Sequence, residues 1–268
     1  MSQFLNKVVV ITGGSEGIGK ALVHLFLSKG AKVATCGRNY DKLYQLQHEL
    51  TAFPLHIATA DVSKESDCEK FITSVIDTFG TIDILINNAG VSMRALFKEV
   101  KLETIRQLID INLWGTIYCT RFAVNEIIKN KGSIVGISSV AGFRGLPGRT
   151  GYSASKFGAT GFLEALRTEL LDDGVNVMWV CPGFTSSNIR NVALNKDARP
   201  QEENPMDESK MMSAEECAGY IANAIEKRKR TLVLTSVGKR TLFISKMFPS
   251  LADRLIKRFY FKKGVLVK

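Results

Sequence analysis

Three side chains in the second half of the chain have the types and the spacing to move a proton. Tyr152 and Lys156 are four residues apart, and Ser139 lies thirteen residues before the tyrosine. A phenol ordinarily keeps its proton to about pH 10, so an acid of this type working near neutrality needs a cation to stabilise its phenolate. Residues four apart share one helix face, which places Lys156 to supply that charge, while Ser139 would hold a substrate oxygen. Alone, such spacing is more typical of an ordinary helix surface.

A glycine-rich turn follows the first apolar run of the chain. Residues 7–12, KVVVIT, predict a strand, and the sequence GGSEGIG follows at once. Gly13 would allow the turn, Gly17 would let the backbone approach a pyrophosphate, and Gly19 would let the next helix pack closely. That amphipathic helix is predicted over 20–29, with amide donors at its N-terminus. A purely structural turn is the alternative, but the position after the first strand favours dinucleotide binding.

Short apolar runs alternate with segments long enough for crossover helices along the whole chain. The pattern predicts a single-domain α/β Rossmann fold, with a doubly wound, mostly parallel seven-stranded sheet and helices on both faces. The predicted strands are 7–12, 32–36, 54–59, 82–86, 132–138, 175–180 and 231–235. The carboxyl ends of such strands form the ligand-binding edge, where the residues singled out above fall.

One domain with a short extension is the predicted organisation. Residues 1–236 form the dinucleotide-binding and catalytic domain, and residues 237–268 form a basic amphipathic extension. The polar run 195–210 contains two prolines and predicts a lid or substrate loop over about 184–212. A helix is predicted to begin after Ser213, because a glutamate three residues later completes a capping box.

The order of these motifs resembles that of the short-chain dehydrogenase/reductase superfamily over roughly residues 5–236. The matching residues are the TGxxxGxG motif beginning at Thr12, Asn87–Gly90, Asn112, Ser139, Tyr152, Lys156 and Pro182-Gly183. Within the superfamily, residues 134–156 and 182–193 are most similar to the dehydrogenase/reductase member 7B type. Seven motifs in this order within one domain-sized chain make a far more specific signal than any one alone.

The resemblance implies hydride transfer between a nicotinamide and a carbonyl carbon. Tyr152 would donate the proton, Ser139 would orient the oxygen, and Lys156 would lower the pKa of Tyr152 and bind the nicotinamide ribose. Asn112 would complete the catalytic set by holding a water against a backbone kink. A buried asparagine satisfied by backbone groups is the alternative for Asn112.

The end of the second predicted strand bears on the choice of cofactor. NAD-preferring relatives usually carry an acidic residue at the position of Gly37, and Arg38 beside it can pair with a 2′-phosphate. NADP(H) is therefore preferred and NAD(H) is the alternative. Glu16 argues the other way, since many NADP-using relatives have a basic residue at that turn position, and Arg38 has an alternative reading as a solvated charge.

The resemblance also implies a set of ligand contacts. The cofactor set is Gly13, Ser15, Gly17, Ile18, Gly19, Arg38, Asp61, Val62, Asn88, Ala89, Tyr152, Lys156, Pro182, Gly183, Thr185 and Ser187. The candidate substrate residues are Ser139, Met93, Phe143, Leu146 and Phe184, with Trp114 as a further aromatic candidate. A core position is the competing interpretation for each aromatic or methionine side chain, and a helix N-terminal region is the competing interpretation for Asp61.

Composition limits the other classes of function. Five scattered cysteines without CxxC spacing and only three histidines give no metal-ligand pattern, and they suggest reduced thiols in a cytoplasmic protein. No apolar stretch approaches the roughly 20 residues of a membrane span. Homodimers or homotetramers are expected by resemblance, through helices near 101–128 and 152–172.

Positive charge is concentrated at the C-terminus. Residues 227–268 carry thirteen Lys or Arg and one acid, Asp253, a net charge of +12, so that residues 1–226 sum to −2. Apolar residues recur at helical spacing among these charges, which predicts peripheral membrane contact or a helix that packs on the domain or on a partner copy. Nucleic acid is not expected as a partner, because no recognition motif accompanies the charge.

Three classes of function remain from the sequence. The leading one is an NADP(H)-dependent carbonyl reductase acting on a hydrophobic or acyl-chain ketone, or the reverse oxidation of a secondary alcohol. The second is a non-catalytic dinucleotide-sensing or scaffold protein, against which the complete set Asn112, Ser139, Tyr152 and Lys156 argues. The third is a lipid-surface binding protein that uses the basic extension.

Overall fold

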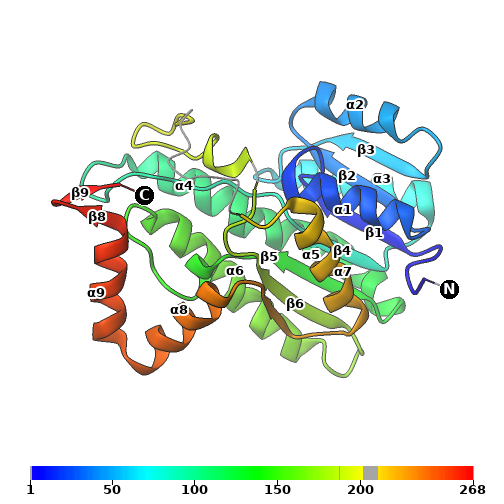
Figure 1. Ribbon diagram of the computed structural model, residues 1–268. Coiled ribbons are helices and arrows are strands. Elements are labelled where there is room, and N and C mark those ends of the chain that lie inside the picture. Colours follow the sequence, from blue (N-terminus) through cyan, green and yellow to red (C-terminus); the bar gives the residue numbers. More distant parts are fainter. Residues whose placement is uncertain (1, 187, 202–210, 268) are drawn as a thin grey trace.

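The strands form a parallel sheet in the order β3-β2-β1-β4-β5-β6-β7 (Figure 1). The computed structural model describes residues 2–186, 188–201 and 211–267. Within them the sheet contains β1 (Val8–Thr12), β2 (Lys32–Gly37), β3 (Leu55–Thr59), β4 (Ile84–Asn87), β5 (Ser133–Ile137), β6 (Asn176–Cys181) and β7 (Thr231–Val233). Every neighbouring pair is parallel. The predicted fold class is confirmed, and each predicted strand end lies within two residues of the observed one.

The central strands were predictable because both of their faces are covered. All residues of β1, β4, β5 and β6 are buried. A parallel strand between two helical layers has no solvent face, so its sequence is a continuous apolar run and not an alternating one.

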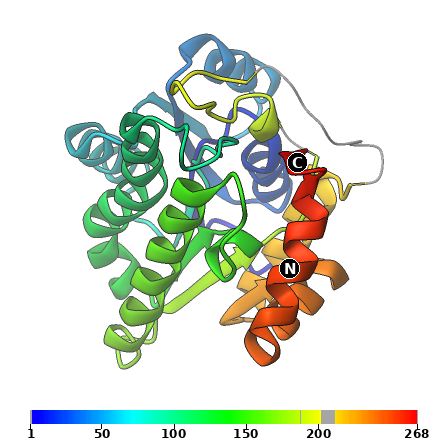
Figure 2. The same ribbon diagram turned by 90° about the vertical axis from the view of Figure 1, so that its left-hand side faces the viewer.

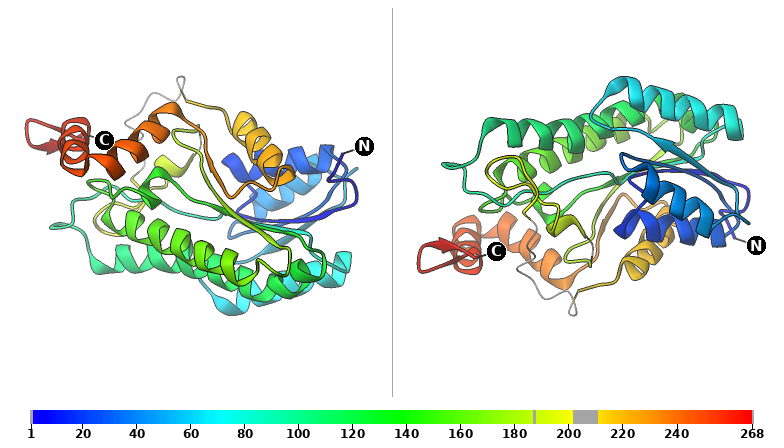
Figure 3. Two further views of the ribbon diagram at one scale, coloured as in Figure 1. Left: turned by 90° about the horizontal axis from the view of Figure 1, so that it is seen from below. Right: turned by 90° about the horizontal axis from the view of Figure 1, so that it is seen from above.

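Helices cover both faces of the sheet (Figure 3). One face carries α1 (Gly17–Ser28), α2 (Tyr40–Glu49) and α7 (Ala214–Glu226). The other carries α3 (Glu65–Phe79), α5 (Gly115–Lys129) and α6 (Thr150–Glu169), with α4 (Leu102–Ile109) against α6. Short helical turns η2 (Val140–Gly142) and η3 (Asn188–Arg190) follow β5 and β6.

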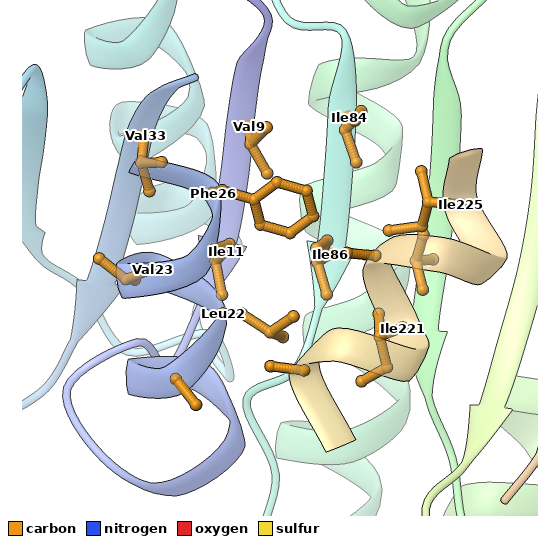
Figure 4. Close-up of a cluster of buried hydrophobic side chains, with 14 of the residues drawn as sticks. Val9, Ile11, Leu22, Val23, Phe26, Val33, Ile84, Ile86, Ile221 and Ile225 are labelled. Atoms are coloured by element: carbon orange, nitrogen blue, oxygen red, sulfur yellow. The ribbon is translucent and has the colours of Figure 1, made fainter. Parts of the chain in front are cut away.

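The α1–α7 layer shows how the core holds the glycine-rich turn in place. Figure 4 shows Phe26 of α1 and Ile221 and Ile225 of α7 lying over side chains of the central strands, among them Ile11 and Ile86. Phe26, Ile11, Ile86 and Ile221 have no exposed surface. Burial of each such side chain stabilises the fold by about 1.5–3 kcal/mol, so α1 is held firmly on the sheet directly after the turn.

Two helix starts bear on the predictions. Helix α1 begins at Gly17, three residues before the predicted Lys20, so the end of the glycine-rich turn forms the first turn of the helix. Helix α7 begins as predicted, since the side chain of Ser213 accepts a hydrogen bond of 3.0 Å from the backbone N–H of Glu216.

Helices α4 and α5 are joined by a π-helical turn, η1 (Asp110–Trp114), without a break in the helical path. Such turns insert one extra residue into the helix and shift the hydrogen-bond pattern. The turn contains Asn112, so this asparagine lies at a backbone irregularity, as the resemblance implied.

The C-terminal residues form two helices and a small hairpin beyond the carboxyl ends of the strands (Figure 1). Helix α8 (Ser236–Met247) is followed by α9 (Pro249–Tyr260) and by the antiparallel pair β8 (Phe261–Lys262) and β9 (Val265–Leu266). Pro249 starts α9, a position where its missing N–H costs nothing, so the two helices cannot merge. None of the helices in the described part of the chain is long and apolar enough to cross a membrane.

Candidate active site

A cavity of about 990 Å³ lies at the carboxyl edge of the sheet. It is lined by the residues that follow β1, β2, β4, β5 and β6, and it includes the point between β1 and β4 where the strand order reverses. The connections on the two sides of this point run to opposite faces, which leaves a crevice where nucleotides bind in folds of this class.

The glycine-rich turn forms one wall of the cavity. Gly13 has φ +69° and Gly17 has φ +54°, values that residues with a Cβ rarely adopt. A Cβ on Gly19 would lie 2.2 Å from the carbonyl oxygen of Gly13, and one on Gly13 would lie 3.0 Å from Cα of Ala89. Only glycines allow this close approach, which leaves the N-terminus of α1 facing the cavity.

Asn88 holds the turn against the end of β4. Its side-chain amide donates hydrogen bonds of 2.9 Å to the carbonyl of Thr12 and 3.0 Å to that of Gly13, and its backbone N–H donates to Thr12 Oγ1 at 3.0 Å. Ala89 N–H donates to the same hydroxyl. The segment therefore positions the glycine-rich turn as well as lining the cavity.

The far end of the cavity contains Gly37, Arg38 and Asp61. Asp61 accepts hydrogen bonds from both the backbone N–H and the hydroxyl of Ser63, at 3.1 and 2.8 Å, so its carboxylate also shapes the turn before α3. Glu16, which argued against NADP, forms an ion pair of 2.6 Å with Lys42, and both residues line the cavity. The negative charge at the turn is therefore balanced locally.

Ser139, Tyr152 and Lys156 come together at the cavity wall. Ser139 follows β5 and its hydroxyl accepts a hydrogen bond from Ala141 N–H at 3.2 Å. Tyr152 and Lys156 lie one turn apart on α6 and are 8% and 6% exposed. Ser139 and Tyr152 are hydrogen-bonded side chain to side chain, and Lys156 Nζ lies 5.9 Å from the centre of the tyrosine ring.

The electrostatics of this group differ from the sequence expectation. Burial raises the pKa of Tyr152, an effect that the hydrogen bond from Ser139 and the charge of Arg149 only partly oppose. Burial also lowers the pKa of Lys156, to about 8. The Lys156 amine donates a 2.8 Å hydrogen bond to the carbonyl of Ile137. The charge of Arg149 thus lowers the pKa of the phenol in this structure, a contribution that the sequence did not predict, and the expected role of Lys156 stays a prediction.

Asn112 is 1% exposed and lies behind the cavity wall, where a Cβ on Gly90 would be 3.0 Å from its Oδ1. Its Oδ1 accepts a hydrogen bond from Val91 N–H, and its Nδ2 donates to the carbonyl of Val91 and to Ser155 Oγ, each at 2.9 Å. The side chain therefore ties the β4 loop to α6, the alternative stated above. The role in holding a water, which the resemblance implied, stays a prediction.

The cavity brings together nearly all of the predicted cofactor residues. Those lining it are Gly13, Ser15, Gly17, Ile18, Gly19, Arg38, Asp61, Val62, Asn88, Ala89, Tyr152, Lys156, Pro182, Gly183 and Thr185. Ser187 and residues 202–210 of the predicted lid lie outside the described residues. These lining residues fit a dinucleotide: the glycines leave room at a helix N-terminus for a pyrophosphate, and Arg38 offers a cation at the far end.

Only part of the predicted substrate set lines the cavity. Ser139, Leu146 and Phe184 do so. Met93 is fully buried in a small core cluster with Tyr152, and Phe143 packs on Trp179 with ring centres 6.4 Å apart. Trp114 stacks on Tyr118 at 5.3 Å on the outer face of the helical layer. These three do not line the cavity, and apolar packing and surface stacking account for their positions.

Sequence reasoning missed Arg149 and Tyr260 as cavity residues. Arg149 Nη1 donates to Ser92 Oγ at 2.7 Å and to the carbonyl of Met93 at 3.4 Å. The arginine also forms a side-chain hydrogen bond with Tyr260 of α9, whose pKa burial raises and Arg149 partly lowers. Arg149 precedes Tyr152 by one helical turn, a spacing that could have singled it out, whereas no sequence signal points to Tyr260.

Helix α9 is the larger addition to the site. Leu255, Ile256 and Phe259 line the cavity beside Tyr260, and α8 contributes Val237 and Thr241. Figure 2 looks toward the carboxyl edge and shows α9 in front of it. The C-terminal residues, expected as an extension separate from the catalytic domain, thus form an apolar wall of the site.

Comparison with known proteins identifies the family. The profile of the family described as short chain dehydrogenase matches residues 7–198, and the chain belongs to this family. It is 30% identical over 260 residues to dehydrogenase/reductase SDR family member 7B of Mus musculus, covering 94% of this chain and 80% of the relative. It is 34% identical over 257 residues to 11-beta-hydroxysteroid dehydrogenase-like 4A of Arabidopsis thaliana, covering 94% and 84%. The predicted similarity to the member 7B type is confirmed.

Solved structures agree with the fold. A short chain dehydrogenase/reductase from Burkholderia phymatum in complex with NAD has a TM-score of 0.84 at 23% identity, over 94% of this chain and 96% of the other. An alcohol dehydrogenase from the archaeon Thermococcus sibiricus, complexed with 5-hydroxy-NADP, has a TM-score of 0.74 at 25% identity, over 87% and 97%. The protein is therefore an oxidoreductase of the short-chain dehydrogenase family that acts on CH–OH or C=O groups. Among the described residues no group of His, Cys, Asp and Glu could hold a metal ion.

Proposed function

We propose that the protein is an NADP(H)-dependent carbonyl reductase, which also catalyses the reverse oxidation of a secondary alcohol, and that Ser139, Tyr152 and Lys156 carry the chemistry. The observation that supports this most directly is the meeting of the three side chains at one wall of a cavity whose remainder fits a dinucleotide. A protein that only sensed the cofactor would need the nucleotide end of this cavity and not a hydrogen-bonded Ser139–Tyr152 pair.

The proposed mechanism follows from the positions of these groups. The reduced nicotinamide, when bound beside Pro182 and Gly183, supplies the hydride that reaches the carbonyl carbon. Ser139 donates a hydrogen bond to the carbonyl oxygen, and Tyr152 gives that oxygen its proton. The tyrosine is left as a phenolate, whose negative charge the neighbouring cations Arg149 and Lys156 stabilise until a proton from solvent replaces the one transferred.

Charge at the second strand supports NADP(H) over NAD(H). Gly37 leaves the end of β2 without a carboxylate, and Arg38 lies beside it in the cavity. Glu16, the acid that weakens this argument, is paired with Lys42 at 2.6 Å. A 2′-phosphate beside the end of β2 would therefore meet the guanidinium of Arg38 at the place where NAD-preferring relatives usually carry a carboxylate.

The cavity wall supports a hydrophobic or acyl-chain ketone as the substrate. Leu146 and Phe184 of the domain face the same cavity as Leu255, Ile256 and Phe259 of α9. Such a surface binds an apolar chain through burial from water, at about 25 cal/mol per Å², while Ser139 and Tyr152 supply the few polar contacts at the carbonyl.

A panel of substrates tests this function. NADPH consumption would be followed with small aldehydes, diketones and long-chain 3-keto compounds, using wild type and Tyr152→Phe. We expect turnover on the long apolar ketones only, and its loss in the variant while NADPH affinity stays nearly unchanged. Equal turnover in Tyr152→Phe would remove the tyrosine from its role, and NADPH binding without turnover on any ketone would favour the sensing or scaffold protein.

Two further assignments belong to the same proposal. The five cysteines are free and buried, which supports a reducing, cytoplasmic location. Assembly as a homodimer or homotetramer is proposed through α4, α5 and α6, with a small-molecule carbonyl or alcohol as the substrate. Both can be tested without knowledge of the substrate.

A further inference from the structure

The C-terminal arm, defined here as residues 236–267, exposes many large apolar side chains. They are Val237, Phe243, Met247, Phe248, Leu251, Leu255, Phe259 and Val265, each between 43% and 65% exposed. Single exposed apolar residues are normal on a protein surface, but a cluster confined to one helical segment marks a surface that contacts something else.

Helix α9 arranges some of these side chains in a stripe. Leu251 and Leu255 are four residues apart and therefore lie on one face, at 47% and 45% exposed. Ala252 and Tyr260, on the neighbouring face, are buried against the domain. The helix thus has two apolar surfaces. One packs against the domain, and the other, the stripe, is exposed to solvent.

Exposed basic side chains accompany the apolar ones along the arm. The exposed ones in the arm are Lys239, Arg240, Lys246, Arg254, Lys257, Arg258, Lys262 and Lys263. Asp253, the sole acid in the sequence after Glu226, forms an ion pair with Arg144 of the domain. The surface presented by the arm is therefore apolar and strongly positive, with its one carboxylate already engaged.

The positive charge of the arm favours an anionic bilayer over a second copy of the chain as its binding partner. A second copy of the arm would bring a second cluster of cations against the first, a like-charge contact that disfavours association. Residues 1–226 sum to only −2, so the domain of a second copy offers little compensation. An anionic bilayer offers both negative headgroups for the basic residues and an acyl region for the stripe.

The arm also lies at the mouth of the cavity. Val237 and Leu255 line the cavity, yet they are 61% and 45% exposed. The same side chains therefore belong to the wall of the site and to the outer surface. Figure 1 shows the arm standing beside the carboxyl edge of the sheet, where the cavity lies.

We propose that the C-terminal arm binds the surface of an anionic lipid bilayer, with Leu251 and Leu255 in the headgroup–acyl boundary and Arg254 and Arg258 against lipid phosphates. Bound in this way, the protein holds the mouth of its cavity at the membrane surface. The binding rests on the exposed face of the arm and is independent of the reaction proposed above, so either can fail without the other.

Vesicle sedimentation of the full chain tests the charge. We expect the protein to sediment with phosphatidylcholine vesicles that contain phosphatidylglycerol, not with phosphatidylcholine alone, and to be released as salt rises. Arg254→Glu with Arg258→Glu should weaken binding at least about 25-fold, taking about fivefold for each basic residue lost near the surface. Lys70→Glu with Lys98→Glu, two exposed lysines of the domain, changes the net charge equally and should leave binding unchanged.

A second pair of variants tests the apolar stripe. Leu251→Ser should weaken vesicle binding about tenfold, while Tyr44→Ser, a 52% exposed residue of α2, should not. Neither residue lines the cavity, so NADPH affinity and thermal unfolding serve as folding controls. The proposal is overturned if the full chain does not bind anionic vesicles, or if the domain variants lose as much binding as the arm variants. It is also overturned if Leu251→Ser changes the molecular mass in solution and not vesicle binding, since the arm is then a contact between copies.

Discussion

The amine of Lys156 is buried, and burial disfavours its charged form, so the activity of the enzyme should depend on pH. Its pKa is lowered to about 8, so the free enzyme loses this positive charge as the pH rises through that value. Reduction leaves a phenolate at Tyr152, which needs the charge. We expect kcat/KM for ketone reduction to be flat below about pH 8 and to fall above it, since this ratio reports the free enzyme.

The matched variant for this prediction is Lys156→Arg. A guanidinium stays protonated beyond pH 12, so the fall near pH 8 should disappear even though the different shape of the side chain lowers the rate. A wild-type profile that stays flat to pH 9.5 would show that Lys156 does not lose a proton in the free enzyme. The measurement is the initial rate of NADPH oxidation at low ketone concentration across the pH range.

Arg149 makes a separate prediction in the direction of alcohol oxidation. There Tyr152 must be deprotonated, and the charge of Arg149 lowers its pKa against the effect of burial. Arg149→Met should therefore move the rising limb of the oxidation profile to higher pH, whereas Arg149→Lys keeps the charge and should leave the limb near its wild-type position. If both variants move the limb equally, the guanidinium acts through its hydrogen bonds to Ser92 and Tyr260 and not through its charge.

Gly37 allows a direct test of cofactor preference. A Cβ there would lie 3.5 Å from Ser15 Oγ and 3.8 Å from Leu43, ordinary contacts that leave room for a side chain. Gly37→Asp adds a carboxylate that repels a 2′-phosphate and can bind ribose hydroxyls, so the ratio of NADPH to NADH affinity should fall about 100-fold. Gly37→Asn adds the same bulk without charge and should change the ratio far less. Dissociation constants from fluorescence titration of both cofactors would measure it, and equal ratios in the two variants would contradict it.

Sequence reasoning at the residue scale succeeded where the chemistry is local. Tyr152 and Lys156 are one helical turn apart, and the glycines of the first turn all lie within residues 13–19. Their spacing in the sequence was therefore enough to predict that each group lies together. The Arg149–Tyr260 contact joins residues more than a hundred positions apart. No local pattern encodes such a contact, because it depends on where α9 packs.

Among the elements, the turn between β1 and α1 leaves the least room for change. Gly19→Ala would place its Cβ 2.2 Å from the carbonyl oxygen of Gly13 and 2.6 Å from Asn88 Nδ2. We expect a loss of about 1–3 kcal/mol in the free energy of unfolding, together with weaker NADPH binding, because the turn must move away from α1.

Gly161→Ala is the control for this effect. Gly161 lies in α6, and a Cβ there meets nothing within 4 Å. The change should leave NADPH binding intact and stabilise the chain by up to about 1 kcal/mol through helix propensity. Urea unfolding of both variants measures their stability, and calorimetric titration measures NADPH binding. An equal loss of stability in the two variants would contradict the prediction, because the close approach of Gly19 to Gly13 would then not be the cause.

The positions of the strands in the sequence were predictable while the role of the last helices was not, for a physical reason. Parallel strands that are buried on both faces are continuous apolar runs, so they can be recognised from their own sequence. Helices α8 and α9 show apolar and basic residues at helical spacing, which predicts an amphipathic helix but not the surface that its apolar face covers. The predicted domain boundary at residue 236 therefore placed α8 and α9 outside the catalytic domain, although both helices line the cavity.

For the whole molecule, exposed apolar residues on the α4–α6 layer support self-association. Trp114 and Phe157 are 42% and 44% exposed on the elements expected to form the contact, and Leu102 and Leu171 at its ends are 66% and 69% exposed. A stable interface buries about 800 Å² on each partner, which two long helices with aromatic side chains can supply. We therefore expect the wild type to be a dimer or a tetramer in solution.

Glutamate at the centre of that layer should break the assembly. Trp114→Glu with Phe157→Glu places two carboxylates in a surface that would be buried between two copies. The free energy needed to bury these unpaired charges exceeds the free energy gained from the remaining contacts. Light scattering after size-exclusion chromatography should report the mass of one chain, whereas Tyr44→Glu, at a 52% exposed aromatic residue of α2, should keep the wild-type mass. A wild type that already runs as one chain would contradict the prediction. Because the C-terminal arm lies at the carboxyl edge and not on this layer, the dissociated variant should still bind anionic vesicles, so the two surfaces can be tested separately.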